Sequence, residues 1–148
     1  MITIQDIDHL AEKFYQHSSF NAEHFPNFDE LQELFFGDGK LINNSTGQPI
    51  ELTVQSFAQS IMKQIESGDL QFFAQQEISD ITEVYGGIAQ RISVFEYSLS
   101  QDPNIPWKRG VNYLQFIKVG EDWKITSAIW SNELEGEKIP EFYLIGLE

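Results

Sequence analysis

Cysteine is absent from the 148-residue chain. Its absence excludes disulfide bonds, a thiolate nucleophile and cysteine-bound zinc, and it is compatible with a reducing compartment. Long hydrophobic runs are absent too, since no stretch approaches the roughly 20 apolar residues of a membrane-spanning helix. The N-terminal stretch MITIQDIDHL lacks the basic and apolar regions of a signal peptide. We therefore expect a cytoplasmic protein without a membrane segment.

Basic residues are scarce. Nine Lys and Arg stand against 23 Asp and Glu, which gives a formal net charge of −14 at pH 7. A field of this sign repels phosphate backbones and anionic lipid surfaces, so we expect neither a nucleic-acid nor a membrane partner. The histidines His9, His17 and His24 are not spaced to converge on one ion, and GDGK lacks the spacing of a phosphate loop. We predict neither a metal site nor a cofactor.

Apolar residues make up 41% of the chain and aromatic residues 14%. This composition and length predict one globular domain over residues 1–148 with a sizeable core. Apolar residues at helical spacing predict a first helix over 4–18, a short helix that starts at Asn27 and ends before Gly37, and a third over 53–67.

The apolar period changes to two from Leu70 onward. This predicts one β-hairpin of residues 70–85 and 88–100, and a second of residues 107–119 and 122–132. A short strand is expected in KLINN, before the third helix. Helices gathered on one side of a curved antiparallel sheet make an α+β domain. Such a sheet forms a cone with a cavity at its open end.

The second hairpin carries a pattern of Arg109, Gly110, Asn112 and Gln115, followed by Trp123, Ile125, Ser127, Trp130 and Glu133. With RISVFEYS in the preceding strand, it resembles functionally unassigned members of the nuclear-transport-factor-2-like superfamily, which includes SnoaL-like and ketosteroid-isomerase-like proteins. The resemblance covers nearly the whole chain. It implies a cystatin-like α+β roll, in which a cone-shaped sheet packs on about three N-terminal helices around a small-molecule pocket. It also implies homodimers formed through the outer sheet face.

The two tryptophans of the last strand, Trp123 and Trp130, differ in parity and would point to opposite faces of a regular strand. A turn at Gly120-Glu121 pairs Phe116 with Ile125 and Leu114 with Ser127. This register places Trp123, Ile125 and Ile129 on the core face. Trp130 then faces outward toward a dimer partner on a regular strand, or inward as a pocket wall if a bulge follows Ser127.

Polar residues of the hairpins are the candidate ligand contacts. Asn112 points to the core side, where a polar group needs a hydrogen-bond partner, and it is our first pocket candidate. Arg109 falls beside Glu133, which predicts either a cross-strand salt bridge or a charged pair at the cone mouth that holds an anionic or carbonyl group. Arg91 lies opposite Thr82 and diagonal to Asp80, as a structural ion pair or a pocket residue.

The resemblance implies one catalytic candidate, since ketosteroid-isomerase-like enzymes carry an oxyanion-stabilising tyrosine in the helix that contains Tyr15. The alternative for Tyr15 is a core residue with its hydroxyl at the rim. The same enzymes carry a carboxylate base on the strand after the second helix, where this chain has Asn43 and Asn44. An amide cannot abstract a proton, which argues against that mechanism. The strand His-Asp pair of dehydratase-like relatives is also missing.

Three functions follow from these residues. The first is a homodimeric small-molecule-binding or otherwise non-catalytic domain, whose mainly apolar pocket uses Arg109, Asn112 and Glu133 as polar contacts. The second is an enzyme of the isomerase, cyclase or dehydratase type, with Glu96 or Asp80 as base. The third is a protein-interaction module that uses the outer sheet face and the apolar tail IPEFYLIGLE.

Overall fold

The computed structural model describes residues 3–21 and 23–146. Within these ranges it contains three α-helices, six strands and a short 3-10 helix. In chain order they are α1 (Thr3–Ser18), α2 (Phe28–Glu33), β1 (Leu41–Asn43), β2 (Ile50–Leu52), α3 (Val54–Ser67), β3 (Ala74–Tyr85), β4 (Ile88–Ser98), β5 (Lys108–Val119), β6 (Asp122–Asn132) and η1 (Glu141–Leu144). No helix in the described part of the chain is long and apolar enough to cross a membrane.

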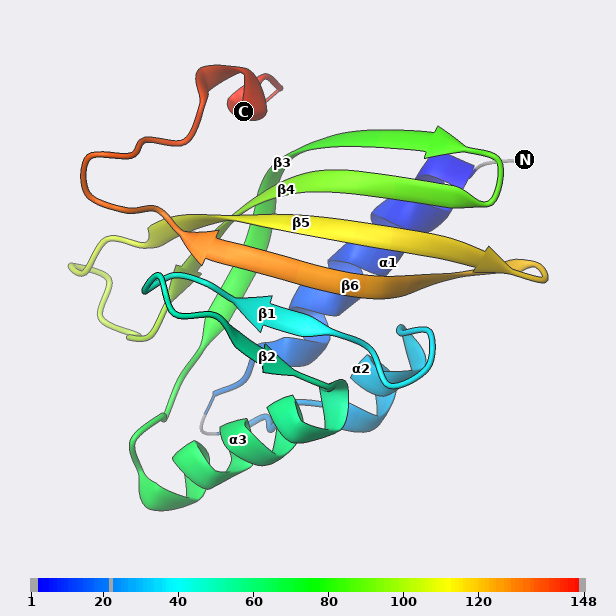
Figure 1. Ribbon diagram of the computed structural model, residues 1–148. Helices are drawn as coiled ribbons and strands as arrows, with labels where there is room; N and C mark the ends of the chain where they lie inside the picture. The colour runs from blue at the N-terminus through cyan, green and yellow to red at the C-terminus, as the bar shows by residue number, and fades with distance from the viewer. Residues whose placement is uncertain (1–2, 22, 147–148) are drawn as a thin grey trace.

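The strands form one curved sheet in the order β2-β1-β6-β5-β4-β3, so it has two edges and is not closed (Figure 1). The two long hairpins are antiparallel, as predicted, but β1 runs parallel to β6. The sheet is therefore mixed, and the expectation of a wholly antiparallel sheet was wrong. Strand β2, which the sequence analysis did not anticipate, pairs only with β1 through three residue pairs. A strand so short carries too little periodic pattern to be recognised.

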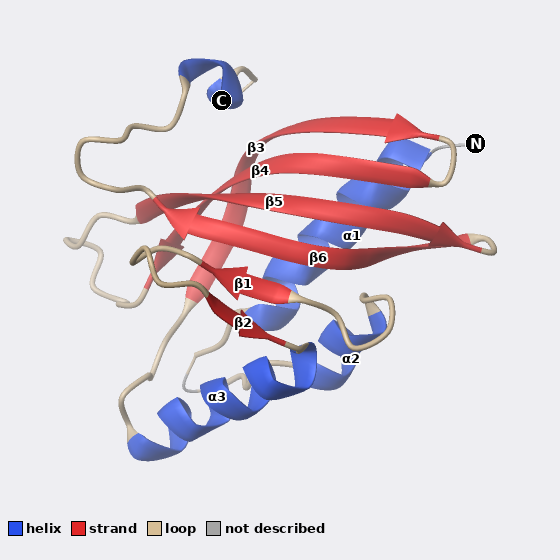
Figure 2. Ribbon diagram, in the orientation of Figure 1, coloured by secondary structure: helices blue, strands red, loops and turns tan. Residues whose placement is uncertain are grey.

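The helices lie together on one side of the sheet, apart from the short C-terminal turn (Figure 2). Helix α3 begins with a capping box, in which the Thr53 hydroxyl oxygen accepts from the backbone N–H of Ser56 and the Ser56 hydroxyl oxygen accepts from the backbone N–H of Thr53. The helix ends at Gly68, whose φ is 84°. The Asn27 side chain caps α2 by accepting from the backbone N–H of Glu30. These local signals explain why the predicted helix positions were confirmed.

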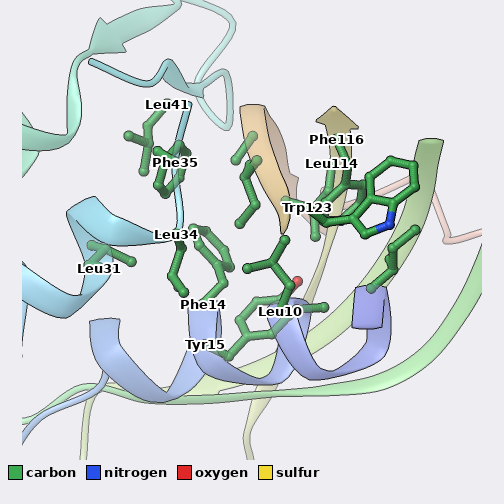
Figure 3. Close-up of a cluster of buried hydrophobic side chains, with 14 of the residues drawn as sticks. Leu10, Phe14, Tyr15, Leu31, Leu34, Phe35, Leu41, Leu114, Phe116 and Trp123 are labelled. Atoms are coloured by element: carbon green, nitrogen blue, oxygen red, sulfur yellow. The ribbon is translucent and has the colours of Figure 1, made fainter. Parts of the chain in front are cut away.

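Helix α1 buries its apolar side against the inner face of the sheet. Phe14 packs on Phe35 with ring centroids 6.1 Å apart, and on Tyr15 at 5.2 Å. Trp123 of β6 enters the same cluster (Figure 3). Burying each large apolar side chain stabilises the fold by roughly 1.5–3 kcal/mol, so this layer holds the helices on the sheet.

A β-bulge in β6 decides the direction of Trp130. Phe116 pairs with Ile125, but Gln115 pairs with Ser127, which leaves Thr126 as the extra residue. Beyond the bulge, Trp130 lies opposite Asn112 on the inner face. Of the two alternatives for Trp130, the structure has the bulged, inward one, with the bulge one residue before Ser127 rather than after it.

The same bulge corrects two details of the predicted register. Leu114 pairs with Ala128 rather than with Ser127, and Leu114 and Ala128 are both fully buried. Ile129 was predicted on the core face, but it points outward and is 42% exposed. One extra residue reverses the parity of everything that follows it, which is why the core assignment failed at Ile129.

A second bulge lies in β3, between Glu77 and Ser79. On the N-terminal side of this bulge, Glu77 pairs with Phe95, whose ring lies on the inner face. In a regular ladder Ile78 would occupy that place and Glu77 would point to the outer face. The bulge therefore brings a carboxylate into the interior.

The outer face of the sheet carries an apolar row that crosses five strands. Ile81 pairs with Ile92, Ile92 with Tyr113, Tyr113 with Ile129, and Ile129 with Ile42 of β1. We call these five residues the outer row. The tail lies on this side of the sheet beside the row, with η1 near β3 in Figure 1.

Two hydrogen bonds fasten the tail to the outer face. The Ser79 hydroxyl donates to the carbonyl oxygen of Tyr143 at 2.8 Å, and the hydroxyls of Tyr113 and Tyr143 lie 2.7 Å apart. The last two residues of the apolar tail, 147 and 148, lie outside the described residues. The tail is therefore a partial cover of the outer face.

Candidate functional site

A cavity of about 320 Å³ opens between the inner face of the sheet, the end of α1 and helix α3. Its aromatic wall consists of Phe14, Phe57, Phe73, Phe95, Tyr97 and Trp130. The amides that reach it are Asn43, Gln64, Gln75, Asn112 and Asn132. Of the residues predicted for the pocket, the structure brings Asn112 and Trp130 together here, as register partners on β5 and β6.

Asn112 is the most enclosed polar residue of the cavity wall. It is only 3% exposed, and its Oδ1 has no hydrogen-bond partner among the described residues. A buried amide oxygen without a partner costs roughly 1–3 kcal/mol, so such an atom calls for an explanation. The other polar groups of the wall include Ser18, whose hydroxyl donates to the Phe14 carbonyl oxygen, and Gln75, whose Nε2 donates to Ser18 Oγ.

A buried chain of polar groups runs behind Asn112, from Tyr15 on α1 to the sheet. The Tyr15 hydroxyl lies 2.6 Å from Ser93 Oγ, and Ser93 Oγ donates to Glu77 Oε2 at 2.5 Å. Glu77 is in turn held by the guanidinium of Arg91, whose Nε donates to Oε2 at 2.9 Å and whose Nη2 donates to Oε1. We call Tyr15, Ser93, Glu77 and Arg91 the buried chain.

Arg91 is 3% exposed and is surrounded by acceptors. Its Nη1 donates to Asp8 Oδ1 of α1 at 2.6 Å and to Thr82 Oγ1 at 3.0 Å, and it lies 3.4 Å from Asp80 Oδ2. Burial acts to lower the pKa of Arg91, but the hydrogen bond and charge of Glu77, together with Asp8 and Asp80, raise it overall. Arg91 therefore stays charged and ties α1 to the first long hairpin, as the ion-pair interpretation anticipated.

Tyr15 lies beneath the cavity and is not part of its wall. It is 3% exposed, and burial raises its pKa well above the ordinary value, although its hydrogen bond with Ser93 and the nearby amide of Asn112 partly offset this. The phenol is therefore protonated at neutral pH. Its place matches the core alternative, with the hydroxyl used by Ser93.

Arg109 and Glu133 lie away from the cavity wall. Arg109 is an odd number of residues from the inward Asn112, so its side chain points to the outer face. The backbone N–H of Glu133 donates to the Arg109 carbonyl oxygen at 2.9 Å, while Glu133 Oε2 accepts from the backbone N–H of Ile139 at 3.0 Å. No ion pair between the two side chains occurs in the described structure.

The two residues predicted as catalytic bases, Glu96 and Asp80, lie outside the cavity wall and bind other side chains. Glu96 points to the outer face and accepts from Gln76 Nε2 at 2.5 Å, and Asp80 belongs to the acceptors around Arg91. Asn43 reaches the cavity, but its Oδ1 accepts from the backbone N–H and the hydroxyl of Ser45. Within residues 3–21 and 23–146, no cluster of three metal-ligating side chains is found.

Sequence reasoning missed the interior carboxylate Glu77 and its partners Ser93 and Asp8. In a regular strand Glu77 would point outward, so the sequence gives no local sign that it lies in the interior. Arg91 was singled out because it lies opposite Thr82 and diagonal to Asp80, but its nearest partner, Glu77, depends on the bulge in β3. Asp8 lies on α1 and reaches Arg91 only through the tertiary fold.

Comparison with known proteins gives similarity in structure. No protein-family model matches the sequence, and no curated protein matches it. An NTF2-like protein with a cystatin-like fold from Novosphingobium aromaticivorans aligns with a TM-score of 0.69, 14% identity and coverage of 95% of this chain and 88% of that one. A protein of unknown function with a cystatin-like fold from Nostoc punctiforme aligns with a TM-score of 0.66, 13% identity and coverage of 87% and 90%.

A candidate scytalone dehydratase from the same Novosphingobium species aligns with a TM-score of 0.60, 16% identity and coverage of 90% and 85%. The chain thus has the nuclear-transport-factor-2-like, cystatin-like α+β fold, and the predicted fold class and resemblance are confirmed at that level. At identities this low, the similarity concerns the fold and selects no activity.

Proposed function

We propose that the protein binds a small, mainly apolar molecule in the cavity and catalyses no reaction on it. The observation that carries the proposal is the composition of the wall, which combines six aromatic rings with amides. In the described residues, the wall contains neither a carboxylate nor a histidine, the groups that most often transfer protons at neutral pH. Burial raises the pKa of the Tyr97 phenol, so it too stays protonated.

The size of the cavity supports the same function. At about 320 Å³ it lies near the lower end of the roughly 300–1,000 Å³ found for small-molecule sites, which suits a molecule of one or two rings. The buried chain lies beneath Asn112 rather than in the wall, and its carboxylate is committed to Arg91. These contacts favour a binding site over the isomerase, cyclase or dehydratase alternative.

Calorimetric titration with 2-naphthol, a two-ring probe, tests this proposal. Ile61 of α3 lines the cavity, so Ile61→Trp fills it and is expected to weaken binding at least tenfold. The control is Ile50→Trp on β2, where the native side chain is 54% exposed and lies outside the cavity wall. Failure of the native protein to bind, or equal affinity of native protein and Ile61→Trp, would contradict the proposal.

We further propose that the outer row mediates a homodimer. Tyr113 and Ile129, near its centre, are 46% and 42% exposed, and contiguous apolar surface of this kind often marks an interface. A second copy packed on this face would bury the row on both chains. Sedimentation analysis tests this: Ile129→Glu should shift the species toward 17.1 kDa, the mass of one chain, whereas the exposed control Ile50→Glu should not. A native protein that is monomeric at micromolar concentration would contradict it.

A further inference from the structure

The charges in the buried chain determine which group donates and which accepts in each of its hydrogen bonds. Glu77 is paired with the charged Arg91, so it accepts from the Ser93 hydroxyl and does not donate to it. Since Ser93 has one hydroxyl proton and gives it to Glu77, the Tyr15 hydroxyl must donate across the 2.6 Å to Ser93 Oγ. The Tyr15 oxygen is left with acceptor capacity only.

Asn112 is the register partner of Ser93 on the neighbouring strand, which places its amide beside the Tyr15 hydroxyl that Ser93 holds. A phenol oxygen that can only accept suits the amide N–H₂ group and not the amide oxygen. The order of protons therefore turns the nitrogen of Asn112 toward Tyr15, and its Oδ1 is the atom left without a partner. Figure 3 shows Tyr15 among the buried side chains of α1.

We propose that Asn112 Oδ1 accepts a hydrogen bond from the ligand, and that the cavity selects apolar molecules that carry one hydroxyl or N–H donor. This inference rests on the proposed binding function. It adds that the protein supplies a hydrogen-bond acceptor and the ligand supplies the donor. Alcohols, phenols and amides with a free N–H fulfil the requirement. Ethers, ketones and carboxylates, which only accept, leave Oδ1 buried without a partner.

Two matched probes test the polarity. 2-Naphthol carries a donor, whereas 2-methoxynaphthalene keeps the rings and the oxygen but lacks the proton. Calorimetric titration of the native protein should show 2-naphthol binding about tenfold more tightly, since the ether leaves a buried acceptor unpaired. Equal affinities, or tighter binding of the ether, would overturn the inference while leaving the binding function standing. Binding of neither probe would overturn both.

Two variants connect the preference to the buried chain. Asn112→Leu, of similar size, removes the acceptor, so the ratio of the two affinities should fall to about one. Tyr15→Phe keeps the ring but removes the hydroxyl that orients the amide, so Asn112 can turn and the ratio should also fall, while both probes still bind. Because Tyr15→Phe leaves Asn112 in place, it serves if Asn112→Leu fails to fold. An unchanged tenfold ratio in either folded variant would overturn the inference.

Discussion

Gly110 shows how closely a single position of β5 is fitted to the cavity wall. A Cβ added there would lie 2.5 Å from Cζ of Phe95 and 3.0 Å from the carbonyl oxygen of Ser131. Phe95 is 4% exposed and forms part of the wall, so its ring has little room to retreat except into the cavity. The sequence marked this glycine only as part of a resemblance, because the neighbouring ring comes from another strand.

We predict that Gly110→Ala lowers the free energy of unfolding by about 1–3 kcal/mol, the usual cost of overpacking, and weakens 2-naphthol binding. Urea denaturation measures the first effect. The control is Gly87→Ala, where the nearest atom, Cβ of Lys118, is 3.8 Å away and a change within about 0.5 kcal/mol is expected. Equal unfolding midpoints for the two variants would contradict the prediction.

At the scale of the element, the bulges place the interior polar and aromatic groups. Thr126 is the unpaired residue of β6, and its hydroxyl donates to the carbonyl oxygen of Gln115 at 3.2 Å. Removing Thr126 would make the ladder regular while Ile125 and Trp130 both stay on the inner face. Removing a regular residue beyond it would reverse Trp130.

We predict that deletion of Thr126 leaves a cooperatively folding protein that still binds 2-naphthol. Deletion of Ile129 should move Trp130 to the outer face and place Ser131 opposite Asn112. Trp130 is partly buried against the core and lines the cavity, and its loss from the inner face removes these apolar contacts, so this second variant should be less stable in urea and should not bind the probe. The reverse ranking of the two deletions would refute the register described for β6.

Tyr113, whose hydroxyl bonds to Tyr143 of the tail, makes the attachment of the tail depend on pH. The hydrogen bond between the Tyr113 and Tyr143 hydroxyls, followed by burial, raises the pKa of Tyr113 to about 12. A phenol with a raised folded pKa stabilises the attached tail fully below the ordinary value of about 10 and loses that effect as pH rises through 12. Tail attachment should therefore weaken between these two pH values.

We predict that Tyr143→Phe lowers the pKa of Tyr113 toward its ordinary value, which a pH titration of ring-labelled tyrosine by NMR would follow. Tyr97, whose raised pKa comes from burial, supplies the internal control and should not change. A Tyr113 titration that is the same in native protein and variant would contradict the hydrogen bond between the two phenols.

The sequence predicted the positions of the helices and strands better than the face of the sheet to which each strand side chain points. Helical spacing, capping residues and glycine turns are local signals, and they positioned three helices and two hairpins. The direction of Glu77, Ile129 and Trp130 depends on bulges, whose extra residues Ile78 and Thr126 look like ordinary strand residues. Parity placed Asn112 correctly because it lies on the partner strand, away from the extra residue. The same parity puts Arg109, three residues before Asn112, on the outer face, so its place away from the cavity could have been predicted. The place of Glu133, which follows the bulge and the end of β6, could not.

At the scale of the whole molecule, charge is the dominant feature. A net charge of −14 on 148 residues produces self-repulsion in the folded state, which salt screens. Raising the ionic strength from about 0.01 to about 0.15 M shortens the screening length from roughly 30 to roughly 8 Å. The ion pair of Arg91 with Glu77, whose side chain is 18% exposed, is better shielded from the solvent and should respond less.

We predict that this increase in salt raises the unfolding temperature by about 2–4 °C for each kcal/mol of relieved repulsion. Replacing the exposed Glu121, Glu135 and Glu137 by Gln changes the net charge from −14 to −11 and should reduce the response. Scanning calorimetry over a salt series measures both. An unfolding temperature that falls with salt in the native protein would show that attractive surface pairs dominate instead.

The three tryptophans of the chain occupy three different surroundings. Trp107 is 43% exposed, Trp123 is 7% exposed with an indole N–H that lacks a partner in the described structure, and Trp130 stands in the cavity wall. Indole emission depends on its surroundings, so the same bulge that turned Trp130 inward also gave the molecule an optical sensor. Occupancy of the cavity should be readable from the fluorescence of the unlabelled protein, with Trp107 reporting only on the solvent.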